Sequence, residues 1–358
     1  MLPCAAGPTV PYAVQIGTRI SLAGGGLKSE VQGQLSMPGK RAFDEQLAAL
    51  DALRTAPAET RSAPLRKALD HRSNFIVAKS ADLIREFNLR NLTPDLLKAF
   101  DHFFANAEKT DPQCWAKNSI SRTLAAFELQ EPDVFLRGMR HIQMEPVYGG
   151  RSDSAGTLRA TCALALVQCR SLNDADLLGH LLQLLADSDK AVRAEVVRAI
   201  EHVGSPSAAL LLRLRATLGK DEPEVLGACY TGILHLEGVK AIPWISRFLA
   251  SEDGDASEAA LAIAGTHSLE AFQALRESLN TAHDPWFQSV LLSAIALTRQ
   301  DVAIDFLLDL VRTESLDAQP AIEAVLRSMP SSDVLDRLEK LVASNPRLAR
   351  TFTSLRKP

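Results

Sequence analysis

The sequence predicts an all-α protein in which short helices stack in pairs to form a right-handed solenoid. Composition is the first indication: of 358 residues, 46% are hydrophobic, 23% charged and only 5% aromatic. Few aromatic residues, with many alanines and leucines, favour packed helices over β-sandwiches or barrels. A chain of this length seldom forms one compact core unless that core is elongated or divided. The other indications are an internal repeat and the helical spacing of apolar residues.

The internal repeat has a period of 31 to 34 residues. The segment VRAEVVRAIEHVG, residues 192–204, aligns with VLGACYTGILHLE, residues 225–237, at an offset of 33. Acidic turns recur with the same period, at Asp187, Asp221, Asp253 and Asp284, which are 34, 32 and 31 residues apart. A fixed period of this size is typical of repeat architectures.

Each repeat is expected to contain two amphipathic helices. Each repeat also holds a partner segment that lies between acidic turns or after the last of them, such as AALLLRLRATL, AIPWISRFLA and AIDFLLDLVR, with apolar residues near i, i+3, i+4 and i+7. Neither helix of such a pair can bury its apolar face alone. Stacking successive pairs produces one continuous core, which is the reason for expecting a solenoid.

These segments resemble the HEAT-repeat superfamily, in particular the short repeats of the phycobilisome-lyase type. The matching positions follow an acidic turn and are Val192, Arg193, Ala199, Ile200, Val203 and Gly204. The resemblance is good over residues 171–330, looser over 43–170 and absent before 43. It implies an armadillo-like helical fold, and it says little about function because this repeat serves many unrelated roles.

Two domains follow from this reading. Residues 43–358 are expected to form the HEAT-like solenoid. Residues 1–42 are expected to form an N-terminal arm, either irregular or a β-hairpin, because apolar residues alternate between Val10 and Leu22 before the AGGG stretch.

One turn of the array is predicted to be enlarged, at residues 142–152. The repeat from Asp111 to Asp153 is 42 residues long, and the excess falls in QMEPVYGGRS. Loops on a rigid scaffold often make the functional contacts. Met144, Tyr148 and Arg151 are therefore candidate partner-binding residues, although a neutral insertion is an equally good interpretation.

A recurring pair of an aspartate and a basic residue, six positions apart, offers a second candidate site. The pairs are Asp111 with Lys117, Asp153 with Arg159, and Asp187 with Arg193. We expect each aspartate to cap the helix that follows it. Six helical residues turn about 240°, so each base is expected to meet an aspartate of a neighbouring repeat. The functional alternative is that Lys117, Arg159 and Arg193 form a basic stripe for an acidic ligand.

No motif for catalysis, a cofactor or a metal is recognisable, so the chain is predicted not to be an enzyme. The eight histidines show neither HxxxH nor HExxH spacing, and no GxSxG occurs. The three tryptophans are interpreted as packing residues. Five cysteines without a CxxC pair indicate small buried residues in a reducing compartment. There is no apolar run that could span a membrane and no basic leader, so a cytoplasmic location is expected.

Charge bears on the class of partner. The net charge is −4, but residues 1–170 hold 21 Lys+Arg against 17 Asp+Glu, or +4, while residues 171–358 hold 18 against 26, or −8. The preferred hypothesis is a non-enzymatic scaffold that binds another protein. The contact surface of that partner is expected to be apolar with an acidic rim. This balance argues against nucleic acid as the partner.

The resemblance implies three functions other than that of a scaffold. A phycobilisome-lyase-type enzyme, or a chaperone-like handler of a chromophore, would need a deep apolar pocket with converging Arg and His side chains. A DNA-binding HEAT solenoid, like the alkylpurine glycosylases of this fold, would need a basic groove. HEAT-repeat deoxyhypusine hydroxylases hold iron on His-Glu pairs, and this sequence has no His-Glu dipeptide.

Overall fold

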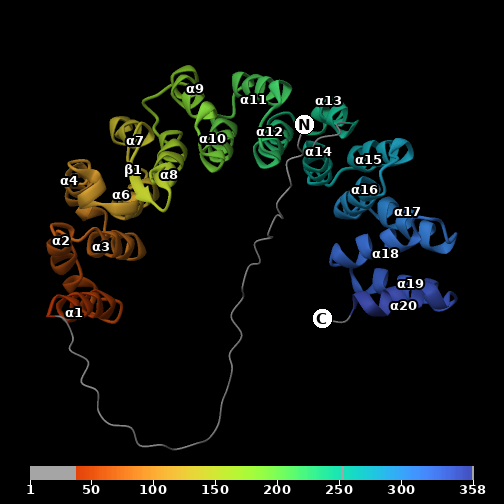
Figure 1. The fold of residues 1–358 in the computed structure, drawn as a ribbon, viewed down its shortest axis with the longest axis horizontal. Coiled ribbons are helices and arrows are strands. Elements are labelled where there is room, and N and C mark those ends of the chain that lie inside the picture. The colour runs from red at the N-terminus through yellow and green to blue at the C-terminus, as the bar shows by residue number, and fades with distance from the viewer. Residues whose placement is uncertain (1–37, 251–253, 357–358) are drawn as a thin grey trace, which may run out of the picture. The chain divides into compact units, whose positions relative to one another are not determined.

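The computed structural model describes residues 38–250 and 254–356, and nearly all regular structure in them is helical. The helices (Figure 1) are α1 Pro38–Ala52, α2 Ser62–Leu69, α3 Asn74–Glu86, α4 Thr93–His102, α5 Ala107–Thr110, α6 Trp115–Ala126, α7 Pro132–Met139, α8 Gly156–Leu166, α9 Asp174–Leu182, α10 Lys190–Val203, α11 Pro206–Leu218, α12 Pro223–Glu237, α13 Ile242–Ile245, α14 Asp255–Ala264, α15 Leu269–Thr281, α16 Pro285–Leu297, α17 Asp301–Arg312, α18 Ala318–Arg327, α19 Ser332–Ala343 and α20 Pro346–Leu355. Short 3₁₀ helices are η1 Ala58–Thr60, η2 Arg90–Leu92, η3 Pro112–Cys114, η4 Gln183–Ala186, η5 Gly238–Ala241 and η6 Ser246–Ala250. The all-α prediction is therefore confirmed.

The chain divides into two compact units, Met1–Gln46 and Leu47–Pro358, with the boundary inside α1. Of the first unit, the structure describes only the beginning of α1. The arm predicted for residues 1–42 lies outside the described residues up to 37, and its last residues belong to α1. Asp253, one of the periodic aspartates, also lies outside the described residues.

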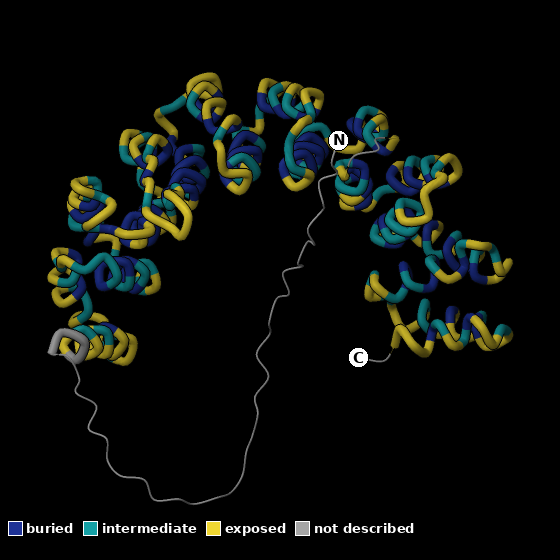
Figure 2. Tube along the Cα trace, in the orientation of Figure 1, coloured by how far each residue is buried: buried dark blue, intermediate teal, exposed yellow. Residues whose placement is uncertain are grey.

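In the second unit, helices pair in sequence and also contact the equivalent helix of the next pair. The row α3, α6, α8, α10, α12, α14, α16, α18 and α20 is continuous, because each helix in it packs against the next. Each also packs against a sequence neighbour outside the row, such as α7 on α8, α11 on α12 or α17 on α18. Figure 2 shows buried residues along the helices of this row.

Several of the residues that the sequence alignment matched lie in the core of the row. Val196 and Ile200 of α10 and their counterparts Cys229 and Ile233 of α12 are fully buried. Full burial of an aliphatic side chain stabilises a fold by about 1.5–3 kcal/mol. Helix α10 ends at Val203 and is capped by Gly204, whose φ of 74° is in the left-handed region that glycine adopts without strain.

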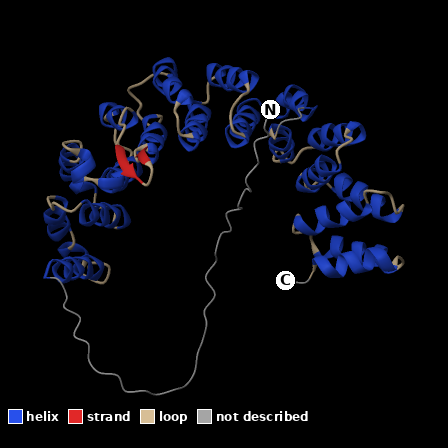
Figure 3. Ribbon diagram, in the orientation of Figure 1, coloured by secondary structure: helices blue, strands red, loops and turns tan. Residues whose placement is uncertain are grey.

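The enlarged turn between α7 and α8 is a β-hairpin, seen as the two strands in Figure 3. Strand β1, Met144–Val147, pairs antiparallel with β2, Gly150–Asp153, and Val147 lies opposite Gly150. Tyr148 and Gly149 form the two-residue turn, and Gly149 has a φ of 88°. A two-residue hairpin turn commonly needs positive φ, which explains the glycine. The hairpin overlaps residues 142–152, where the repeat length predicted an enlarged turn, and its two strands were not part of that prediction.

Candidate functional site

The hairpin exposes the apolar side chains that the sequence suggested for partner binding. Tyr148 at its tip is completely exposed, and Met144 is 38% exposed. Val147, which the sequence analysis did not single out, is 51% exposed. The third predicted contact, Arg151, bonds to the Met144 carbonyl and forms an ion pair with Glu108 at 2.8 Å. Arg151 therefore joins the two strands of the hairpin and attaches the hairpin to Glu108 of α5.

A partly buried carboxylate fixes the base of the hairpin. Glu145 Oε1 accepts hydrogen bonds from the Gln113 amide at 2.6 Å, from Gln143 Nε2 at 2.6 Å and from Ser154 Oγ at 2.7 Å. Burial alone would raise the pKa of Glu145, but these hydrogen bonds outweigh it, so the pKa lies below its usual value. The carboxylate thus anchors the hairpin to η3 and to the start of α8.

Gln143 continues this network into the interior. Its Nε2 also donates to the Asp111 carbonyl at 2.8 Å, and its Oε1 accepts from the Cys114 thiol at 3.3 Å. His141 Nε2 lies 3.0 Å from the same Oε1. Because that oxygen can only accept, His141 carries its proton on Nε2.

Neither the cysteine nor the histidine of this network is prepared for catalysis. Burial raises the pKa of Cys114 to about 11, so its thiol stays protonated and weakly nucleophilic at neutral pH. Burial likewise lowers the pKa of His141, against the raising effect of its hydrogen bond to Gln143. Cys114, Cys162, Cys169 and Cys229 are all buried and unpaired, as the sequence predicted for the cysteines.

The predicted basic stripe is not a surface feature. Lys117 is fully buried, and its ammonium group pairs with Asp111 at 2.9 Å and donates to the Phe103 carbonyl at 3.1 Å. Arg159 is 3% exposed and joins Asp153 at 2.6 Å to Asp187 at 2.7 Å. The interpretation of these two residues as a site for an acidic ligand is therefore wrong, because their charges are neutralised inside the protein.

The third basic residue links adjacent repeats. Arg193 binds Asp221 at 2.7 Å and donates to the Asp187 carbonyl at 2.6 Å. Arg193 and Arg159 thus meet an aspartate of the next repeat, as the spacing predicted. Lys117 instead pairs with Asp111 of its own repeat, and Arg159 also binds Asp153 of its own repeat, so the inference that the six-residue spacing keeps such partners apart is wrong at both residues.

The three predicted caps behave differently. Asp111 accepts the first-turn amides of α6, from Ala116 at 2.9 Å and Lys117 at 3.1 Å, although it precedes the helix by four residues. Asp153 accepts the Ala155 amide at 3.0 Å, which lies before the first turn of α8, so the prediction that Asp153 caps this helix is wrong.

Asp187 is not the cap of α10. That position belongs to Asp189, whose side chain accepts from the Ala191 amide, whereas Asp187 accepts the amide of Asp189 at 2.9 Å and binds Arg159. Its carboxylate is used to join two repeats, so it cannot also cover the helix end.

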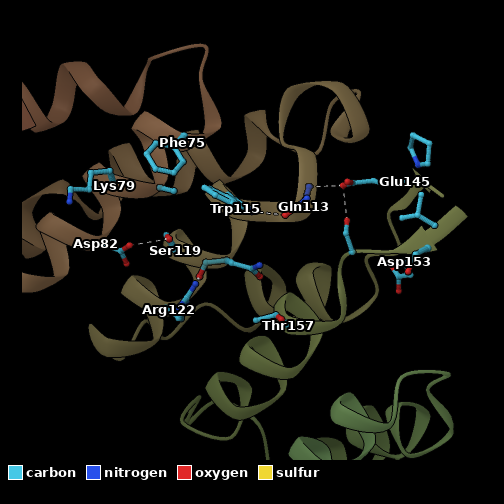
Figure 4. Close-up of a pocket in the computed structure, with 16 residues that line it drawn as sticks. Phe75, Lys79, Asp82, Gln113, Trp115, Ser119, Arg122, Glu145, Asp153 and Thr157 are labelled. Carbon is cyan, nitrogen blue, oxygen red and sulfur yellow. Dashed lines mark hydrogen bonds between the residues drawn. The ribbon is translucent and has the colours of Figure 1, made fainter. Parts of the chain in front are cut away.

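A groove of about 690 Å³ lies beside the hairpin, between α3, α6 and the start of α8 (Figure 4). One face of α6 contributes Trp115, Asn118 and Arg122, which are spaced three and four residues apart. The Trp115 ring is 43% exposed and lies 5.0 Å from the ring of Phe75 on α3. The hairpin contributes Val147 at the other side.

Asn118 lines the groove and carries an unsatisfied acceptor that is itself buried. It is only 9% exposed, and its Oδ1 has no hydrogen-bond partner within the described part of the chain. Buried polar atoms without a partner are rare and often belong to a site that a ligand completes.

Sequence reasoning missed Trp115 and Asn118. Trp115 was interpreted as a packing residue because a tryptophan at a helix start shows no signal of exposure. Gln113 and Cys114, with φ of 58° and 54°, turn the chain so that this ring lies at the surface. Non-glycine residues rarely adopt that region, so the sequence gives little warning of it.

The arrangement does not point to metal chemistry. Among residues 38–250 and 254–356, no three His, Cys, Asp or Glu side chains lie close enough together to hold a metal ion. None of the helices there is long and apolar enough to cross a membrane. In comparisons with known proteins, the chain matches no family model and no curated sequence.

Proposed function

We propose that this chain is a HEAT-like α-solenoid that binds another protein through the hairpin and the adjoining groove. The observation that carries the proposal is the apolar hairpin tip, with Val147 51% exposed and Tyr148 fully exposed, on a base held by the bonds of Glu145. Exposed apolar side chains on a rigid support indicate an interaction site. A preorganised site also loses little conformational entropy when it binds.

The solenoid itself is supported by the order of helix contacts. Each helix of the row from α3 to α20 packs on the next, and Arg159 and Arg193 form ion pairs across successive repeats. Such nearest-neighbour contacts are what a repeat array requires.

The groove narrows the chemistry of the partner. Trp115 and Val147, which are exposed and line the groove, suit an apolar or aromatic side chain. The sequence analysis predicted an acidic rim on the partner to match Lys117 and Arg159, but these two residues are buried and paired. The exposed Arg122 lies in the groove instead, and it favours one acidic group on the partner. We therefore infer a peptide-like segment with an apolar anchor beside an acidic residue.

The alternatives gain no support from this site. A chromophore-handling protein of the phycobilisome-lyase type would require Arg and His side chains to converge, and the groove is lined by one Arg and by no His among the described residues. A DNA-binding solenoid would require a basic groove, whereas this one also contains Asp82, Glu145 and Asp153.

The test combines cross-linking with a surface substitution. A photoreactive phenylalanine analogue at position 148 should yield a covalent adduct with the partner in the native host. The double variant Val147→Ser with Tyr148→Ser should then weaken binding of that partner at least about tenfold, a loss of about 1.4 kcal/mol. The hairpin base is untouched, so folding should be preserved.

Leu316 provides the matched control, since it is fully exposed and distant in sequence from the hairpin. Leu316→Ser should leave binding unchanged. If the double variant binds the cross-linked partner at full strength, the hairpin is a neutral insertion and the proposal fails.

A further inference from the structure

Helix α11 carries a second apolar face that nothing in the chain covers within the described residues. Leu210, Leu214 and Leu218 are 69%, 54% and 61% exposed, while Leu212 and Ala216 on the opposite side are buried. The three leucines are four residues apart, so they form one ridge along the helix. A helix that is apolar on both sides is normally covered on both sides.

A groove runs beside this ridge, between α9 and α11. It has a volume of about 300 Å³, and its lining includes Leu178, Gly179 and Leu182 of α9 and Leu210 and Leu214 of α11. No other atom lies within 4 Å of the point where a Cβ of Gly179 would stand, so the floor of the groove is open. No charged side chain lines it.

We propose that a second copy of this chain covers the α9–α11 face in a twofold symmetric dimer. A twofold interface uses the same patch on both copies, so the patch must be complementary to itself. This face meets that condition because it holds a ridge and a groove side by side. The leucine ridge of each copy then packs into the groove of the other.

Charges at the two ends of the face favour an antiparallel arrangement, in which the twofold axis is perpendicular to the helices. Asp174 and Asp176 are exposed at the start of α9, and Lys220 is exposed just beyond the end of α11. Helices α9 and α11 run in the same direction, because short connections make each antiparallel to α10 between them. The antiparallel dimer therefore places Lys220 of one copy beside Asp174 and Asp176 of the other.

Sedimentation equilibrium and a cross-link together test the dimer. The full chain should change from monomer to dimer between about 1 and 100 µM, as expected for a narrow apolar interface. Leu214 lies in the middle of the ridge, so Leu214→Cys in a Cys4→Ser background should form a disulfide-linked dimer under mild oxidation. The four remaining cysteines are buried and should not react.

Two variants with an introduced aspartate test whether dimerisation depends on the α9–α11 face. Leu214→Asp should weaken the dimer at least about tenfold, because a carboxylate enters the apolar interface. Leu261→Asp, at a 43% exposed position on α14, should leave it unchanged, and circular dichroism should confirm that both variants fold. A full chain that stays monomeric to 100 µM, or a Leu214→Cys variant that does not cross-link, would overturn the proposal. Growth into species larger than a dimer would also overturn it.

Discussion

Lys117 shows how a single residue can differ from what its spacing suggests. Six helical residues would separate it from Asp111 by about 240°, but Asp111 precedes α6 by a bend in which Gln113 and Cys114 have positive φ. The bend places the Asp111 carboxylate at the N-terminal end of α6. There it pairs with the ammonium group of Lys117 and accepts hydrogen bonds from the first-turn amides. The pair is consequently buried rather than presented to a ligand.

Removing one member of this pair should be costly. Lys117→Met would leave Asp111 buried with its charge uncompensated, and breaking a buried pair in this way costs about 3–5 kcal/mol. We expect a loss of that size in the free energy of unfolding, measured by urea denaturation followed by circular dichroism.

Lys98→Met is the matched control for that measurement. Lys98 pairs with Asp70 at the same distance, 2.9 Å, but both side chains are largely exposed. Solvent screening makes such pairs worth at most about 1 kcal/mol. Similar losses for the two variants would show that the buried charge of Asp111 is not what Lys117 balances.

At the scale of the element, many helices end in a residue with left-handed backbone that is not glycine. Asn88, Glu128, His267, Arg299 and Met329 have φ between 49° and 56° and follow α3, α6, α14, α16 and α18. This region costs a non-glycine residue about 1–2 kcal/mol. The chain therefore accepts strain at these turns, and relieving it should stabilise the fold.

Met329→Gly offers a direct measurement of that strain. The side chain is 86% exposed, so its removal sacrifices little packing, while glycine adopts a φ of 52° freely. We expect the free energy of unfolding to rise by about 0.5–1 kcal/mol after the greater flexibility of glycine in the unfolded chain is included. Leu316→Gly, in an exposed turn without positive φ, should give no gain, and equal effects at the two sites would argue against relief of strain.

The hairpin marks the limit of prediction from sequence at this scale. Its location was predictable because the repeat from Asp111 to Asp153 is longer than its neighbours. Its two strands were not, since each has four residues and is defined by pairing with the other. The bond from the Gln113 amide to Glu145 joins segments 32 residues apart, a contact that no local pattern shows.

For the whole molecule, the helical pairs were predictable and the use of their surfaces was not. The 31–34-residue period and the apolar spacing correctly placed buried residues such as Val196 and Ile233. Charged residues were harder, because Arg159 is recognisable as basic but its burial depends on aspartates from two repeats. Exposed leucines such as Leu214 have the same spacing as core leucines, so only the folded chain distinguishes them.

Charge burial should make the stability of the protein depend on pH in two stages. The pKa of Asp221 would be raised by burial, but hydrogen bonds from Arg193, the Glu222 amide and Arg215 hold it well below its usual value. Its contribution to stability is complete above the unfolded pKa of 3.8 and is lost as the pH falls through the lower folded pKa. The second stage therefore begins near pH 4.

The first stage belongs to His141. Burial lowers its pKa from 6.5, so below about pH 6.5 the unfolded chain takes up a proton that the folded protein does not. Stability falls wherever the unfolded state binds more protons as the pH decreases. Lys117 adds to this direction by repelling the charged form, while the hydrogen bond to Gln143 and the carboxylates of Asp153 and Asp111 oppose it without outweighing burial. We expect urea denaturation to show a decline in the free energy of unfolding from pH 7 to pH 5.

Two variants separate these stages. His141→Gln keeps an amide donor for Gln143 and should remove the decline between pH 7 and 5 while leaving the one below pH 4. Asp221→Asn should do the opposite, because it lowers stability at pH 7 by breaking the ion pairs with Arg193 and Arg215 but flattens the curve at low pH. If the free energy of unfolding of His141→Gln falls between pH 7 and 5 as steeply as that of the wild type, His141 does not cause the decline. That outcome would contradict the lowered pKa that burial gives this histidine.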